Sequence, residues 1–140
     1  MAAALLLAGC GSVHALRDFR TDGCSFYPEG NVDDPELWRD CCVAHDMAYW
    51  QGGTADERRG ADVQLSDCVL ARTGSPGLAK RMYRGVRLSG APLLPTTFRW
   101  AYGWGFGRGY APLDATERQR AAELLAAYRR GAGGSAGGKP

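Results

Sequence analysis

Residues 38–50 have the sequence WRDCCVAHDMAYW, and this stretch predicts an amphipathic helix. Its apolar and cysteine side chains recur at spacings of three and four residues, the period of one helix face. The members of this inward stripe are Leu37, Trp38, Cys41, Cys42, His45, Ala48 and Tyr49. Asp34 can cap the helix and Pro35 suits its first position, while Gly52–Gly53 ends it. We therefore predict a helix over residues 34–52.

A second helix is predicted directly after the first. Thr54 can cap it, and Glu57 completes a capping box three residues later. The inner stripe of this helix, which ends near residue 73, contains Ala61, Leu65, Cys68 and Val69. Because the connector QGGT (51–54) is short, the two helices are expected to pack antiparallel. The predicted fold class is a small, disulfide-stabilised all-α domain built on this hairpin.

Two more helices are expected towards the C-terminus. Ser75 and Pro76 start a short one, and Asp114 with Glu117 forms a capping box before an amphipathic helix that ends at residue 130. That helix can pack against the core or lie on a lipid surface. The aromatic and glycine-rich segment 98–112 can likewise form core and turns or an interfacial surface.

Length and charge bound the possible functions. A chain of 140 residues suffices for one domain. Its 17 basic and 15 acidic residues leave a formal net charge of +2, and no dense run of Lys and Arg is present. Nucleic acid is therefore not an expected partner. The N-terminal apolar run of roughly 7 residues is far shorter than the roughly 20 residues that cross a bilayer.

The N-terminal segment MAAALLLAGC (1–10) ends in the Leu-Ala-Gly-Cys pattern at which a bacterial lipoprotein signal is cut. We expect Cys10 to carry lipid, so that the protein is extracytoplasmic, either anchored to the bacterial envelope or secreted. An ordinary cleaved signal or a buried N-terminal segment is the alternative. The expected organisation is a signal at 1–9, a linker at 10–21, a helical domain at 22–130 and a flexible Gly/Ser tail at 131–140.

His45 and Asp46 are neighbours on the first helix, so their side chains point about 100° apart and need separate roles. His45 faces inward, seven residues before Gly52, and Asp62 lies eight residues after Thr54. Across an antiparallel hairpin the two fall at nearly the same height. A hydrogen bond between them would satisfy both groups and leave the other ring nitrogen of His45 free as a base. Tyr49 could donate its hydroxyl to the same carboxylate.

The four cysteines other than Cys10 suit two disulfides in an oxidising compartment. Cys41 and Cys68 are nearly level across the hairpin, so a disulfide there would lock its register. Cys42 would then pair with Cys24 and clamp the loop 22–31 close to Asp46. Calcium takes six to eight oxygen ligands, many of them backbone carbonyls. The pinned loop beside Asp46 is therefore a candidate calcium site, with carbonyl donors from Gly23, Ser25 and Tyr27.

The segment CCVAHDMAYW (41–50) resembles the signature of the secreted phospholipase A2 family, and DGCS (22–25) resembles the calcium loop of its bacterial and fungal members. Asp62 precedes Cys68 by six residues, as the dyad aspartate precedes a cysteine in that family. The resemblance covers residues 22–70. It implies His45 as general base, Asp62 as its orienting partner, Asp46 as the calcium carboxylate and Tyr49 as a supporting donor. It also implies the pairs Cys24–Cys42 and Cys41–Cys68.

The resemblance implies calcium-dependent hydrolysis of a glycerophospholipid acyl ester, by a monomer that acts on a phospholipid membrane or lipid substrate. The alternative is a non-catalytic envelope lipoprotein that uses the same scaffold for binding. A zinc site is disfavoured because His14 and His45 are the only histidines and the cysteines suit disulfides better.

Overall fold

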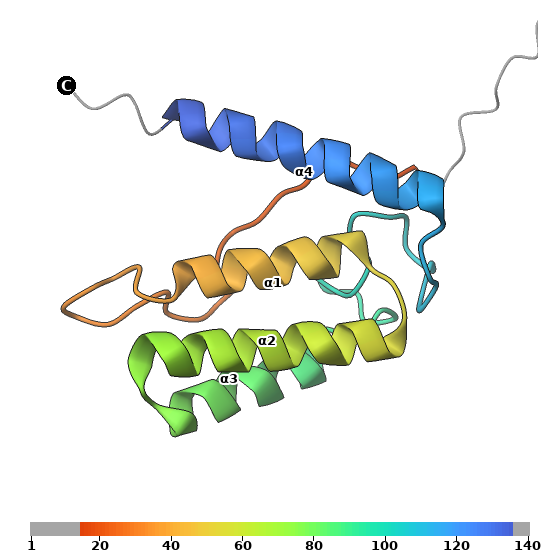
Figure 1. Ribbon diagram of the computed structural model, residues 1–140. Coiled ribbons are helices and arrows are strands. Elements are labelled where there is room, and N and C mark those ends of the chain that lie inside the picture. The colour runs from red at the N-terminus through yellow and green to blue at the C-terminus, as the bar shows by residue number, and fades with distance from the viewer. Residues whose placement is uncertain (1–14, 136–140) are drawn as a thin grey trace, which may run out of the picture.

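The computed structural model describes residues 15–135, and the side chains of residues 15–132. This part of the chain is all-helical and contains no strand, as predicted (Figure 1). Its elements are α1 (Arg39–Gln51), α2 (Ala55–Thr73), α3 (Pro76–Ser89) and α4 (Ala115–Ser135). None of the described helices is long and apolar enough to cross a membrane. The expected signal at 1–9 and the lipidation at Cys10 lie outside the described residues.

The helical hairpin forms as the sequence predicts. The side chain of Thr54 accepts the N–H of Glu57, and the Glu57 side chain accepts the N–H of Thr54. Gly74 ends α2 in a left-handed conformation, and the hydroxyl of Ser75 caps α3. In Figure 1, α1 and α2 run side by side in opposite directions, with α3 packed behind α2. The hairpin thus brings the middle of α1 level with the middle of α2.

Helix α1 begins at Arg39, four residues after Pro35, the predicted first helical position. The backbone N–H of Trp38 donates to the carbonyl oxygen of Glu29 at 2.9 Å, and its indole Nε1 donates to the carbonyl oxygen of Pro28 at 2.7 Å. Residues 35–38 therefore form tight turns that hold the preceding loop. Asp34 accepts the N–H of Glu36 within these turns and does not cap the helix.

The segment 98–104 forms core over the C-terminal end of α1. The N–H groups of Ala101 and Gly103 donate to the carbonyl oxygens of Tyr49 (2.7 Å) and Trp50 (3.1 Å). Trp100 and Trp104 are buried, whereas Phe106 and Tyr110, further along the segment, remain exposed. A Cβ at Gly103 would lie 2.6 Å from the Trp50 indole, so this close approach needs glycine. Of the two alternatives for residues 98–112, core and turns or an interfacial surface, the first therefore holds for residues 98–104.

Two predicted boundaries differ from the structure. Residues 15–21, predicted as linker, belong to the core because Leu16 and Phe19 are buried and Phe19 contacts the ring of Tyr128 on α4. Helix α4 runs to Ser135, so the segment 131–135 is helix where a flexible tail was predicted. Glycine weakens a helix by only about 1 kcal/mol per residue, and no proline interrupts this one. Residues 136–140 lie outside the described part.

Candidate hydrolytic site

The His45 imidazole and the Asp62 carboxylate meet inside the hairpin. His45 Nε2 lies 2.7 Å from Asp62 Oδ1, and the Tyr49 hydroxyl donates to the same oxygen at 2.7 Å. Asp62 is completely buried, and His45 is 8% exposed. Burial raises the pKa of the Tyr49 hydroxyl, as does the nearby Asp62, so Tyr49 stays a donor at neutral pH. The three residues predicted to form this cluster are therefore in direct contact, with the ring of His45 against that of Tyr49.

Burial alone would raise the pKa of the Asp62 carboxyl, but hydrogen bonds from His45, Arg87 and Tyr49 outweigh burial and lower it. Asp62 is therefore ionised at neutral pH. An ionised carboxylate accepts only, so Nε2 of His45 carries the proton and donates it. The Nδ1 atom is left as the ring's basic nitrogen.

Both predicted disulfides are present and hold this arrangement. Cys41–Cys68 joins α1 to α2, with their Cα atoms 5.7 Å apart. Cys24–Cys42 joins the loop to α1, with a Cα separation of 5.1 Å. The first bond fixes the register in which His45 meets Asp62. The second fixes the loop beside Asp46.

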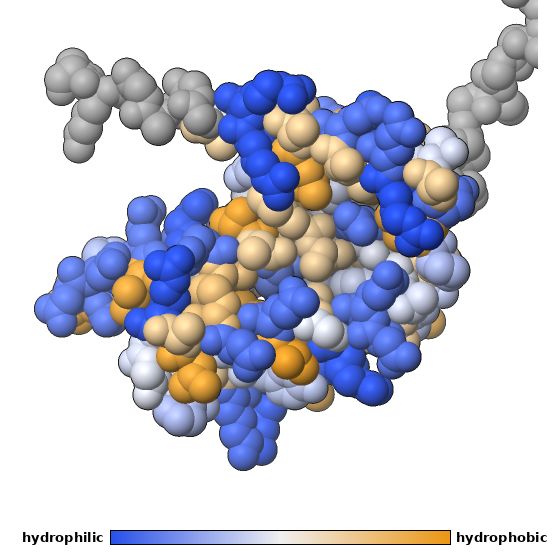
Figure 2. Space-filling model, in the orientation of Figure 1, coloured by the Kyte–Doolittle hydropathy of each residue, from blue (hydrophilic) through white to orange (hydrophobic). Residues whose placement is uncertain are grey.

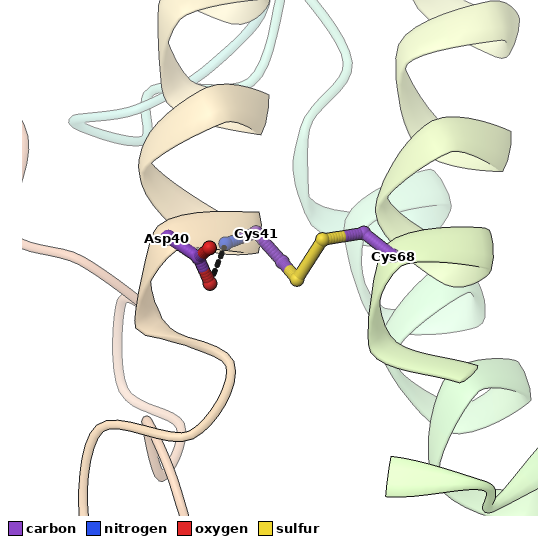
Figure 3. A group of neighbouring side chains, drawn as sticks. All are labelled: Asp40, Cys41 and Cys68. Atoms are coloured by element: carbon purple, nitrogen blue, oxygen red, sulfur yellow. Dashed lines mark hydrogen bonds between the residues drawn. A yellow bond between two sulfur atoms is a disulfide. The ribbon is translucent and has the colours of Figure 1, made fainter. Parts of the chain in front are cut away.

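Asp40 lies next to the Cys41–Cys68 bond, and the three side chains gather potential metal-ligating atoms within a few ångströms (Figure 3). Each cysteine sulfur is already bonded to the other, so neither is available as a thiolate ligand. Asp40 accepts the N–H of Cys41 at 3.0 Å and pairs with Arg72. This group is a structural junction between α1 and α2.

Two arginines that were not predicted as site residues contact the Asp62 cluster. Arg87 of α3 donates through Nη1 to Asp62 Oδ2 at 2.7 Å. Arg58 of α2 is 3% exposed and donates through Nε to the Tyr49 hydroxyl at 3.0 Å. A signal for Arg58 exists, because it lies four residues before Asp62 and so shares its helix face. Arg87 carries no such signal, because its position depends on how α3 packs.

Gly90, which follows α3, allows the Tyr49 ring to reach this cluster. A Cβ at Gly90 would lie 2.5 Å from Cε2 of Tyr49 and 2.8 Å from its hydroxyl oxygen. Any larger residue would therefore displace Tyr49 or the end of α3. The glycine is needed for this close approach.

Asp46 points away from the dyad towards the loop, as its place on α1 predicts. Its Oδ2 accepts the Thr21 hydroxyl at 2.7 Å, and Thr21 Oγ1 accepts the N–H of Gly23 at 3.0 Å. Burial raises the pKa of the Asp46 carboxyl to about 7; the Thr21 hydrogen bond lowers it, and the charge of nearby Asp22 raises it further. Asp22, which was not predicted as a site residue, is thus a second carboxylate close to Asp46.

The donor set here suits a hard divalent cation. Asp46 is buried, and neither it nor Asp22 forms an ion pair with any residue in the described part of the chain. A buried carboxylate without an opposite charge beside it is costly, and a second negative charge nearby adds to that cost. Calcium is bound by carboxylate and carbonyl oxygens, and the loop supplies both kinds. The residues therefore fit calcium.

A cavity of about 350 Å³ joins the two halves of the site. The predicted residues that line it are Gly23, Ser25, Tyr27, His45, Asp46 and Tyr49. Asp62 lies behind His45 and does not line the cavity. Apolar side chains of Leu65, Met82 and Val86 form part of the remaining wall. The cavity thus exposes the imidazole and the Asp46 carboxylate to one ligand.

A second hollow of about 470 Å³ lies between α1 and α4. On the face seen in Figure 2, apolar side chains gather in this recess, where Val43, Met47 and Tyr128 contribute to the lining. Its charged members are Glu36, Arg39 and Asp40, and no histidine lines it. Although larger, this hollow has no counterpart to the buried pair of His45 and Asp62, so the cavity at His45 is the candidate site.

No family model, curated protein or solved structure matches the chain. The function is therefore inferred from the geometry of the site together with the sequence motif.

Proposed function

We propose that the protein is a calcium-dependent phospholipase A2-type hydrolase that cleaves an acyl ester of a glycerophospholipid. The observation that carries the proposal is the 2.7 Å contact between His45 Nε2 and Asp62 Oδ1 in a cavity shared with Asp46. This contact supports Nδ1 as a base in the same cavity as a candidate cation site. The sequence motif over residues 41–50 points to the same chemistry.

His45 has the surroundings that a general base requires. In the proposed reaction its Nδ1 takes a proton from a water molecule, which then attacks the ester carbonyl. The imidazolium that forms keeps its Nε2–H bond to Asp62, whose negative charge stabilises it. The Tyr49 hydroxyl donates to the same oxygen of Asp62 and restricts the movement of the carboxylate. Asp62 thus orients the ring without exchanging a proton.

Asp46 would hold calcium together with carbonyl oxygens from the loop, for which Gly23, Ser25 and Tyr27 are the candidates. When bound, calcium would neutralise the substrate phosphate and the negative charge that develops on the ester oxygen. Thr21 holds Oδ2 of Asp46 through its hydroxyl and so fixes the carboxylate beside the loop. The Cys24–Cys42 disulfide holds the loop to α1 four residues before Asp46.

The cavity wall suits a lipid rather than a small polar ester. Leu65, Met82, Val86 and Phe98 supply apolar side chains to the lining. An acyl chain gains free energy when such side chains replace water around it. A charged head group would meet the candidate cation site at Asp46 in the same cavity. This combination of apolar lining and candidate cation site supports a glycerophospholipid as the substrate class.

The experiment measures fatty-acid release from phosphatidylcholine and phosphatidylglycerol vesicles by the protein with both disulfides formed. Release is compared in millimolar calcium and in the presence of a chelator. We expect release that requires calcium and leaves a lysophospholipid. Vesicle binding without release, in both lipids and with both disulfides intact, would contradict the enzyme and favour the non-catalytic lipoprotein.

A further inference from the structure

We propose that Arg87 is a positioning residue of the hydrolytic site, which holds the Asp62 carboxylate in the orientation that His45 needs. This proposal rests on the proposed function for its catalytic consequence. Arg87 does not line the cavity and so does not meet substrate. It acts through Asp62.

The two oxygens of Asp62 have separate partners. Oδ1 accepts hydrogen bonds from His45 Nε2 and the Tyr49 hydroxyl, each at 2.7 Å. Oδ2 accepts a hydrogen bond from Arg87 Nη1 at 2.7 Å. Among residues 15–132, whose side chains are described, Arg87 is the only partner of Oδ2. Both oxygens of the carboxylate are therefore held, which fixes its plane. Arg87 holds one of them from a different helix, α3.

Loss of the guanidinium would leave Oδ2 as a completely buried acceptor without a partner. Such a group costs about 1–3 kcal/mol, and more when it is charged. Rotation of the carboxylate about its terminal torsion, which has broad minima, is the simplest way to relieve that cost. Rotation would move Oδ1 away from His45 Nε2. The imidazole would then lose its fixed tautomer.

The backbone of α3 that carries Arg87 is itself held in place by Arg58. Nη2 of Arg58 donates to the carbonyl oxygens of Val86 (3.1 Å) and Arg87 (2.9 Å), in the last turn of α3. These carbonyls carry the negative end of the helix dipole, so a buried cation is favourable there. Arg58 of α2 thus binds the backbone of α3, and Arg87 of α3 binds the Asp62 side chain of α2. The two arginines therefore link the same two helices in both directions.

A purely structural link between α2 and α3 would give a different result. Replacement of Arg87 would then lower the free energy of unfolding and leave the turnover of the folded enzyme unchanged. Positioning lowers kcat of the folded enzyme and leaves KM unchanged, because Arg87 is outside the cavity. The conservative Lys variant keeps a charged donor and should recover part of the loss.

The test uses Arg87→Met, Arg87→Lys and the control Arg84→Met, which removes an exposed arginine one turn earlier on the same helix. Turnover is measured with calcium on dihexanoyl phosphatidylcholine below its micellar concentration, which removes surface binding from KM. We expect a loss in kcat on the order of 10–100-fold for Arg87→Met, the range for partners that orient a catalytic ligand. KM should stay within about twofold. Arg87→Lys should be intermediate and Arg84→Met unchanged.

A second readout does not depend on turnover. Only two histidines are present in the chain, so the imidazole N–H signal of His45 can be assigned in ¹⁵N-labelled protein. We expect one slowly exchanging Nε2–H proton in wild type and Arg84→Met. In Arg87→Met it should exchange faster and the Nδ1–H tautomer should appear. If Arg87→Met fails to fold, Arg87→Lys carries both measurements.

Wild-type kcat in Arg87→Met together with an unchanged His45 signal would overturn the proposal and leave Arg87 as a structural link. Inactive wild-type protein would instead contradict the proposed function. The His45 signal would then decide alone: loss of the slow Nε2–H proton in Arg87→Met supports positioning, and its retention overturns it.

Discussion

His45 and Asp62 lie 17 residues apart in the chain, yet Nε2 of the first is 2.7 Å from Oδ1 of the second. The short connector between α1 and α2 and the Cys41–Cys68 disulfide produce this contact. One sets the turn of the hairpin, and the other sets its register. Since Asp62 is fully buried, the contact also contributes to stability. Folding and the proposed function therefore depend on the same pair of residues.

Replacement of both Cys41 and Cys68 by Ala should lower the free energy of unfolding by about 3–4 kcal/mol. The loop closed by this bond spans 27 residues, and its closure entropy gives that magnitude. Turnover should fall as well, because the hairpin register is no longer locked. Urea unfolding and vesicle hydrolysis of the variant measure the two effects. Wild-type values in both would show that the helix packing alone fixes the register.

Asp62 should make the protein sensitive to acid. Burial opposes its charged form, but the hydrogen bonds from His45, Arg87 and Tyr49 place its folded pKa below the ordinary value of 3.8. Its stabilisation is therefore complete above the unfolded pKa and is lost as the pH falls through the folded pKa. Urea unfolding between pH 6 and pH 2 should show a steeper loss for wild type than for Asp62→Asn. Parallel curves would contradict the lowered pKa.

Asp46→Asn should abolish the stabilisation of the protein by calcium. Ligand binding to the folded state stabilises it by an amount that grows with the logarithm of the ratio of ligand concentration to Kd, and so raises the melting temperature. Asp46 is the buried carboxylate of the candidate site. Scanning calorimetry with calcium and with chelator measures this for wild type and variant. The exposed Asp67→Asn change serves as a control that keeps the calcium shift. An equal shift in Asp46→Asn would place the cation elsewhere.

Tyr49→Phe should lower both stability and kcat. The change removes the hydroxyl that donates to Asp62 and accepts from Arg58, and we expect a loss of about 1–3 kcal/mol for the buried groups left without partners. Tyr110→Phe is the matched control, because its hydroxyl also accepts from Arg58, whereas the hydrogen-bond partners of Asp62 are His45, Tyr49 and Arg87. Equal kcat in the two variants would mean that Tyr49 is only a structural partner of Arg58.

The dyad could be predicted from sequence because it depends on local rules. The capping box at Thr54 and the glycines at 52–53 fix where the two helices meet. The helical period then determines which side chains of each helix face the other. The contact of His45 with Asp62 follows from counting residues on either side of that turn. The all-α fold class follows from the same periodicity, which recurs in α3 and α4.

Other parts of the site depend on packing between distant segments and gave no local signal. Arg87 reaches Asp62 only because α3 folds back against α2. Asp34 fails to cap α1 because Trp38 bonds to Pro28 and Glu29 in the preceding loop, and neither bond follows from helix propensity. Asp22 becomes a neighbour of Asp46 through the loop conformation that the Cys24–Cys42 disulfide imposes. Such contacts become visible only when the tertiary structure is known.

The measurement that tests the central claim most directly compares fatty-acid release by wild-type protein and His45→Gln in the same calcium-containing vesicle assay. The Gln amide can still donate to Asp62 but cannot accept a proton from water. We predict calcium-dependent release by wild type and a loss on the order of 10²–10⁴-fold in the variant, the usual contribution of a general base, with an unchanged circular dichroism spectrum. Release by the folded variant at the wild-type rate, or none by the wild type, would contradict His45 as the base of a phospholipid hydrolase.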